Sequence, residues 1–225
     1  MALPETVEVE LGSDIARSVV WLHGLGADGH DFEPIVPELA LGPAGVRFVF
    51  PHAPVRPVTI NMGMPMRAWY DILSLDRDGP QDERGIRESA ALLGELVERE
   101  HARGVAYERI VVAGFSQGGA IALHAGTRFG RRLAGIMGLS TWLPLASTFA
   151  AEALANRAFP AAELPVFMAH GTFDPTIPIE YGRGSAEALR RGGFPVEWHE
   201  YPMAHAVCAE EIADIRRWLV AVLDL

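Results

Sequence analysis

Residues 114–120 read Gly-Phe-Ser-Gln-Gly-Gly-Ala and contain the pattern Gly-x-Ser-x-Gly, with Ser116 at its centre. A run of apolar, β-branched residues (110–113) precedes the pattern, and residues 121–124 follow it with helical spacing. In such a sharp turn from strand to helix the serine takes a strained backbone conformation, and the flanking glycines leave room for the crossing chains. We therefore predict that Ser116 stands exposed at a helix N-terminus as a nucleophile. A glycine-rich helix entry with an N-capping serine is the alternative interpretation.

A serine hydroxyl is a weak nucleophile until a base takes its proton, and an acid must orient that base. In proteins that use this turn for catalysis, the acid and then the histidine follow the serine along the chain. We expect His124 on the helix that leaves the turn, His170 at the end of a strand too near the candidate acid, and His199 within the last strand. His205 lies in the loop after the last predicted strand (196–201), at the sheet edge where ligands bind. We predict His205 as the base rather than a solvated surface histidine.

The candidate acid is Asp174, which lies just past the end of the predicted strand 166–169. It precedes His205, and no other aspartate lies between Ser116 and His205. A turn-forming Asp-Pro pair is the alternative interpretation. Glu180, about one helical turn further along the chain, is the fallback acid.

Acyl transfer through a serine also requires N–H donors aimed at the oxyanion of the tetrahedral intermediate. One donor is expected from Gln117, the residue after the nucleophile. The second is expected from the glycine-rich loop 23–30, which follows the predicted strand 18–22, and we predict Leu25 as that donor. The loop also matches Gly-x-Gly-x-x-Gly, but no helix begins within it and no acid ends the next strand. A dinucleotide site is therefore rejected.

A substrate-binding groove is expected from residues 60–71, which hold three of the seven methionines together with a tryptophan and a tyrosine. Flexible thioethers and aromatic rings suit a groove that accepts an acyl chain. We predict Met64 and Trp69 on one wall, and Trp142 and Leu143 on the opposite wall. Packing in the core is the alternative for each of them.

The elements that must position these residues alternate between short apolar runs and longer helical segments. Such alternation predicts an α/β fold with a mostly parallel sheet and helices on both faces. Helices are predicted over 83–103 and 210–223. The segments 51–70 and 141–164 read as long excursions above the sheet, of the kind that is often functional. The predicted strands are 18–22, 46–50, 110–114, 134–139 and 166–169, with 196–201 as a more polar candidate near an edge.

Length and composition exclude several classes of protein. A chain of 225 residues without an internal repeat predicts one domain over 1–225. With Cys208 as its one cysteine the chain has no internal disulfide, and we expect a packed thiol there. All 19 basic residues are arginines, which excludes Schiff-base, pyridoxal-phosphate and P-loop chemistry. We predict no metal and no cofactor.

Charge and hydropathy bear on partners and location. The net charge of −10 disfavours nucleic acid as a partner. No apolar run is long enough for a membrane span, and the acidic residues 1–8 do not resemble a secretory signal. A soluble, cytoplasmic protein with a small-molecule substrate is expected.

Four motifs together resemble the phospholipase/carboxylesterase family of serine hydrolases, which includes bacterial carboxylesterases and acyl-protein thioesterases. They are residues 21–32, 67–71, 114–119 and the loop around His205, and they occur in the family's order along nearly the whole chain. The resemblance implies an α/β-hydrolase fold without a large lid domain, a triad of Ser116, Asp174 and His205, and an oxyanion hole from Leu25 and Gln117. It also implies ester or thioester substrates of short to medium acyl length, and often a homodimer.

The chain departs from the family at Thr141 and Trp142, where a glycine and a tyrosine are usual, and this bears on the width of the groove. Asp28 follows the bacterial esterase form of the first loop and favours small esters. We therefore expect a serine carboxylesterase that acts through an acyl-enzyme. The alternatives are an acyl-protein thioesterase or lysophospholipase with the same triad, and a non-catalytic binding protein of the same fold.

Overall fold

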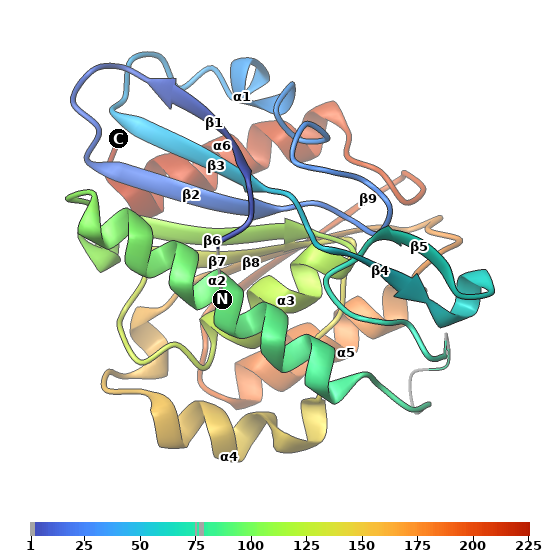
Figure 1. The fold of residues 1–225 in the computed structure, drawn as a ribbon. Coiled ribbons are helices and arrows are strands. Elements are labelled where there is room, and N and C mark those ends of the chain that lie inside the picture. Colours follow the sequence, from blue (N-terminus) through green and yellow to red (C-terminus); the bar gives the residue numbers. More distant parts are fainter. Residues whose placement is uncertain (1–2, 75, 77–78) are drawn as a thin grey trace.

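A seven-stranded sheet in the order β1-β3-β2-β6-β7-β8-β9 forms the centre of the structure (Figure 1). The computed structural model describes residues 3–74, 76 and 79–225. Strand β1 pairs antiparallel with β3, and the remaining neighbours pair in parallel. The strands are β1 (Thr6–Leu11), β2 (Arg17–Leu22), β3 (Val46–Pro51), β6 (Ile110–Phe115), β7 (Gly135–Leu139), β8 (Val166–Gly171) and β9 (Val196–Tyr201).

Helices cover both faces of this sheet, which explains why its central strands are apolar without alternation. Successive side chains of β2 point to opposite faces. Val20 packs with the cluster that includes α2, α3, α4 and α5, whereas Val19 packs with the cluster that includes α1 and α6. The α/β fold predicted from the sequence is thus confirmed. The helices are α1 (Ile35–Glu38), α2 (Glu83–Ala102), α3 (Gln117–Gly126), α4 (Ala146–Asn156), α5 (Ile179–Arg191) and α6 (Ala209–Leu223).

The six predicted strands and two predicted helices are present with bounds shifted by a few residues. Strand β1 was not predicted, although valine and glutamate alternate along it with the period of a half-buried strand. It is a half-exposed edge strand, and the antiparallel pairing with β3 leaves its glutamates near solvent. Strand β9 lies at the other edge, as its polar sequence predicts.

The two long segments that follow strands contain regular structure of their own. The first holds a hairpin of β4 (Val55–Val58) and β5 (Met64–Arg67), joined through the short helix η1 (Thr59–Asn61), and it projects beyond the end of β3 (Figure 1). The second holds α4, which packs Phe149 and Ala153 into the core instead of staying above the sheet edge. The short helices η2 (Tyr107–Arg109) and η3 (Ala161–Glu163) lead into β6 and β8. In the described residues, no helix combines the length and apolarity needed to cross a bilayer.

Candidate active site

Ser116 occupies the turn between β6 and α3 with a φ of 53° and a ψ of −120°, a strained conformation for a residue with a side chain. Two glycines make this turn possible. A methyl group on Gly114 would overlap the backbone of Gly118, and one on Gly118 would overlap the carbonyl of Leu22. The turn places the Ser116 side chain at the N-terminus of α3, as the motif predicts.

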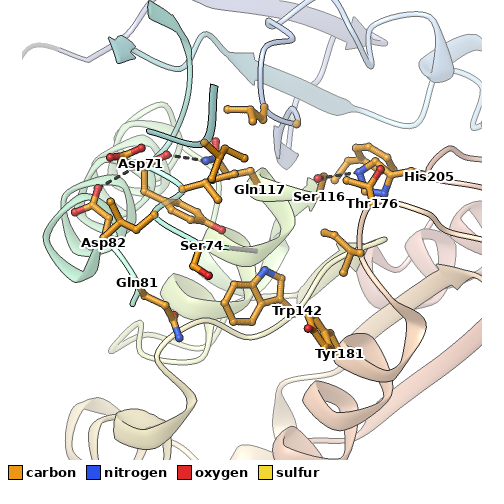
Figure 2. Close-up of a pocket in the computed structure, with 18 of the residues that line it drawn as sticks. Asp71, Ser74, Gln81, Asp82, Ser116, Gln117, Trp142, Thr176, Tyr181 and His205 are labelled. Atoms are coloured by element: carbon orange, nitrogen blue, oxygen red, sulfur yellow. Dashed lines mark hydrogen bonds between the residues drawn. The ribbon is translucent and has the colours of Figure 1, made fainter. Parts of the chain in front are cut away.

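A chain of hydrogen bonds joins Ser116, His205 and Asp174. Nε2 of His205 is 2.9 Å from Oγ of Ser116 (Figure 2). Nδ1 of the same ring is 2.7 Å from Oδ2 of Asp174. Since the carboxylate accepts at Nδ1, the neutral imidazole has a free lone pair at Nε2 for the serine proton. The three residues follow β6, β8 and β9, whose carboxyl ends meet at one edge of the sheet.

The Asp174 carboxylate is fully buried and firmly held. Its Oδ1 accepts main-chain hydrogen bonds from Thr176 and Ile177, at 2.8 and 2.9 Å. Its Oδ2 faces Nδ1 of His205 at 2.7 Å, and Nε2 of His170 lies 3.4 Å from the same oxygen. The fallback acid Glu180 is instead 68% exposed and lies 3.9 Å from Arg183. Asp174 is therefore the carboxylate that can orient the imidazole.

The other downstream histidines lie where the sequence predicts, away from the Ser116 hydroxyl. His124 is buried on α3, and burial lowers its pKa to about 4. His170 is buried at the end of β8, donates through Nε2 to the carbonyl of Ile177, and has a pKa lowered by burial. His199 lies within β9.

The two predicted oxyanion donors lie next to the nucleophile. Leu25 and Gln117 line the same cavity as Ser116. The loop packs directly against the turn of the nucleophile, since a methyl group on Gly24 would come 3.3 Å from the Phe115 ring and 3.5 Å from Cβ of Ser116. Within the described residues, the Leu25 N–H has no acceptor in the protein, so it is available to a ligand.

A cavity of about 370 Å³ extends from Ser116 between residues 70–74, 76 and 80–82 on one side and the start of α5 on the other. Figure 2 shows Ser116 and His205 at one end and Asp71 and Asp82 toward the other. Most of the lining is apolar, as an acyl chain requires. Besides His205, the acidic and basic residues described in its wall are all aspartates: Asp31, Asp71, Asp76 and Asp82.

The four residues predicted to bind substrate lie in different places. Trp142 lines the cavity. Trp69 is completely buried beneath it, where its indole N–H donates to the carbonyl of His23 at 2.8 Å. Leu143 is 2% exposed and its N–H donates to Ser185. Met64 lies on the β4–β5 hairpin and is 51% exposed. The expectation that all four line the groove is corrected, since residue type does not determine the direction of a side chain.

Other apolar residues supply the walls instead, and sequence reasoning missed them. They come from three separate segments: the hairpin, the loop before α2 and the start of α5. Their signal in the sequence is weak, because four of them lie in loops or short turns of mixed polarity and Tyr181 lies on α5, a helix that was not predicted. They are Ile60, Ile72, Leu73, Ile177 and Tyr181.

The geometry of the strained serine, its histidine and the buried aspartate, on a parallel sheet covered by helices, defines a serine hydrolase of the α/β-hydrolase fold. More specifically, the chain belongs to the phospholipase/carboxylesterase family, whose model matches residues 5–223. In the described residues, no three His, Cys, Asp or Glu side chains are grouped to hold a metal ion.

Two of the most similar curated relatives are both named acyl-protein thioesterase 1. The protein from Mycosarcoma maydis is 40% identical over 222 residues, covering 92% of this chain and 91% of the relative. The protein from Gibberella zeae is 40% identical over 218 residues, with the same coverage. Among solved structures, acyl-protein thioesterase 2 of Zea mays has a TM-score of 0.87 at 32% identity and covers 98% of this chain and 99% of its own.

Proposed function

We propose that this chain hydrolyses acyl thioesters through an acyl-enzyme on Ser116, and that carboxylic esters of short to medium acyl length enter the same site. The observation that carries acyl transfer is the hydrogen-bond chain from Ser116 through His205 to Asp174 at the end of the apolar cavity. The preference for thioesters is supported by the relatives named acyl-protein thioesterase 1. These relatives favour a thioesterase over the small-ester carboxylesterase that the sequence analysis expects.

The residue that favoured small esters, Asp28, acts within its own loop. Its carboxylate accepts a hydrogen bond from the main-chain N–H of His30 at 2.8 Å. It is not among the residues described in the cavity wall. Asp28 therefore gives no reason to prefer an oxygen ester over a thioester.

The reaction follows from the geometry. His205 takes the Ser116 proton as the oxygen attacks the acyl carbon, and Asp174 stabilises the imidazolium that forms. The N–H groups of Leu25 and Gln117 stabilise the oxyanion, a contribution of about 10²–10³ in rate for each donor. The imidazolium then protonates the leaving thiolate or alkoxide. Water attacks the acyl-enzyme by the same route and releases the acid.

The cavity wall also bears on the substrate. Its aspartates favour a leaving group that is neutral or cationic, and they disfavour one that carries phosphates. A thioester of a peptide cysteine or of a neutral small thiol therefore fits the charge of the cavity better than a thioester of coenzyme A does. A lysophospholipid, the other alternative from the sequence, carries a phosphate and is disfavoured on the same ground.

The test compares an octanoyl thioester and an octanoyl oxygen ester on the same neutral leaving-group skeleton, with kcat/KM of each divided by its rate of hydroxide hydrolysis. We expect the normalised value to favour the thioester, and Ser116→Ala to lose about 10³-fold or more of either activity. A normalised preference for the ester would return the assignment to a carboxylesterase. Absence of turnover, together with no labelling of Ser116 by a fluorophosphonate, would leave the non-catalytic alternative.

The single-domain organisation and the homodimer expected from the sequence stay predictions. Limited proteolysis would check the first, since a single domain yields no stable fragment. Size-exclusion chromatography with light scattering would check the second.

A further inference from the structure

The peptide unit between Gly24 and Leu25 carries the proposed oxyanion donor. In a trans peptide the C=O and the following N–H lie in one plane and point in opposite directions. The direction of the Leu25 N–H is therefore set by whatever holds the carbonyl of Gly24. That carbonyl accepts a hydrogen bond from the side chain of His23, with an Nδ1 to O distance of 2.7 Å.

The hydrogen bonds of His23 determine which ring nitrogen carries the proton. The main-chain N–H of Ala53 donates to Nε2 at 3.0 Å, so Nε2 is the acceptor. The proton is then on Nδ1, which donates to the carbonyl of Gly24. The side chain is 2% exposed, and burial lowers its pKa to about 4, so the ring is neutral at pH 7. His23 is thus a fixed donor to one peptide unit.

A second set of hydrogen bonds connects His23 to the other proposed donor. The indole N–H of Trp69 donates to the His23 carbonyl at 2.8 Å. The side chain of Gln117 accepts from the Trp69 main-chain N–H at 2.8 Å and donates to the carbonyl of Tyr70 at 2.7 Å. On the far side of Leu25, the N–H of Gly26 donates to Arg67 at 2.9 Å. Both donor loops are therefore attached to the segment 67–70.

We propose that His23 is a positioning residue, whose Nδ1–H fixes the plane of the Gly24–Leu25 peptide so that the Leu25 N–H faces the oxyanion. This role rests on the proposed acyl transfer at Ser116. The same carbonyl also accepts a longer hydrogen bond from the Ala27 N–H, at 3.3 Å. Without the shorter bond from His23 the peptide unit is therefore held less firmly. The Leu25 N–H would then spend part of its time directed away from the intermediate, and the loss would fall on the transition state rather than on substrate binding.

A matched pair of variants tests whether His23 acts through its hydrogen bond to Gly24 or only fills a buried space. The side-chain amide nitrogen of Asn reaches the position of Nδ1, so His23→Asn keeps a donor to Gly24 and loses the acceptor for Ala53. The longer Gln reaches the position of Nε2, so His23→Gln keeps the acceptor and loses the donor. Each variant loses one buried hydrogen bond, so comparable losses of stability are expected.

We expect His23→Gln to lose about 10- to 100-fold in kcat with KM changed by less than about twofold, somewhat less than full removal of an oxyanion donor. His23→Asn is expected to keep kcat within about threefold of wild type, since it retains the donor. Thermal unfolding of both variants controls for stability. Equal kcat values for the two variants would overturn the proposal. A wild-type protein without turnover would instead overturn the proposed function.

A measurement on the unaltered protein keeps the proposal testable if the variants do not fold. The ¹⁵N shifts of the His23 ring report which nitrogen is protonated. We expect the Nδ1–H tautomer at pH 7. The Nε2–H tautomer would overturn the proposal whether or not the protein turns over a substrate, because Nδ1 could not then donate to Gly24.

Discussion

The side-chain hydroxyl of Thr141 donates a hydrogen bond to the main-chain carbonyl of Ser116, with an Oγ1 to O distance of 2.7 Å. Thr141 is fully buried just after β7, the strand next to the one that leads to the nucleophile. Its methyl group fills the space left by Gly119 and Gly138. Thr141, where the family usually differs, therefore stabilises the strained turn of Ser116 through this hydrogen bond and its packing. Its bulk does not narrow the groove, although the sequence suggested that it would.

Thr141→Val keeps the shape of the side chain and removes the hydroxyl. We expect it to lower the free energy of unfolding by about 1 kcal/mol, because a buried hydrogen bond to the Ser116 carbonyl is lost. We also expect a several-fold loss of kcat with little change in KM. Thr141→Ser, which keeps the hydroxyl, is the control and should retain kcat. A Val variant as active as the Ser variant would show that the hydrogen bond does not support the nucleophile.

Asp174→Asn tests the orientation of His205. The amide can present its NH₂ group where the carboxylate accepts from Nδ1, which favours the wrong tautomer, and the imidazolium loses its counter-charge. We expect kcat to fall by about 10²–10⁴-fold with the fold retained. The matched control is Glu180→Gln, which removes an exposed carboxylate on α5 and should leave kcat unchanged. A large loss from the Glu180 variant would reassign the acid.

The parts of the site that depend on backbone order are readable from the sequence. Ser116, Asp174 and His205 each follow a predicted strand of a parallel sheet, and parallel strands bring their carboxyl ends to one edge. Chain order then excludes His124 and His170, which precede Asp174, and the position of His199 within the last predicted strand leaves His205. The strand order was not predicted, and the structure shows that the loop of Leu25 lies beside the nucleophile because β2 and β6 are neighbours in the sheet.

The parts that depend on side-chain direction are not readable in this way. Trp69 and Met64 are both large and apolar and lie five residues apart, yet one is completely buried and the other is 51% exposed. What separates them is the β4–β5 hairpin, whose pairing was not predicted. The hydrogen bonds of His23 and Thr141 likewise join residues to backbone groups of the turns, and a residue type carries no signal of such partners.

Two glycine-to-alanine substitutions test whether the turn of the nucleophile needs glycine for close packing or only for the flexibility of the backbone. Gly114→Ala places a methyl group against the backbone of Gly118, so the turn cannot form without moving. We expect it to abolish activity and to destabilise the protein by several kcal/mol. Gly94→Ala is the control on α2, where the nearest atom to the new methyl group is 3.9 Å away on Phe129. It should raise stability by about 0.5–1 kcal/mol, because alanine favours a helix interior over glycine.

Glu211 is a buried carboxyl group that the reaction does not use. It lies in the first turn of α6 with 0% exposure, and neither oxygen has a hydrogen-bond partner among the described residues. Burial raises its pKa to about 8, with a smaller opposing effect from the main chain of Cys208. The neighbouring tyrosine, Tyr201, has a raised pKa, mainly from its own burial and its bond to Asp214. Because burial raises the pKa of Glu211 to about 8, the folded protein keeps this carboxyl group protonated at pH 7.

This shift makes stability depend on pH in a defined direction. The ordinary pKa of the group is 4.5, so between about pH 4.5 and pH 8 the unfolded chain has lost the proton that the folded chain keeps. The folded state binds more protons in that range, so the contribution of Glu211 to stability falls as pH rises. The fall is at most about 1.4 kcal/mol per pH unit. Above the folded pKa the contribution no longer changes.

Glu211→Gln removes the titration while keeping the shape of the side chain. We expect the variant to gain stability relative to wild type from pH 5 to pH 8, by up to about 4 kcal/mol over the three units, as measured by urea unfolding at each pH. Glu210→Gln is the control, because Glu210 lies in the same helical turn but is exposed. The Glu210 variant should follow the wild-type pH dependence. Parallel curves for the Glu211 variant and wild type would mean that Glu211 titrates alike in the folded and unfolded states.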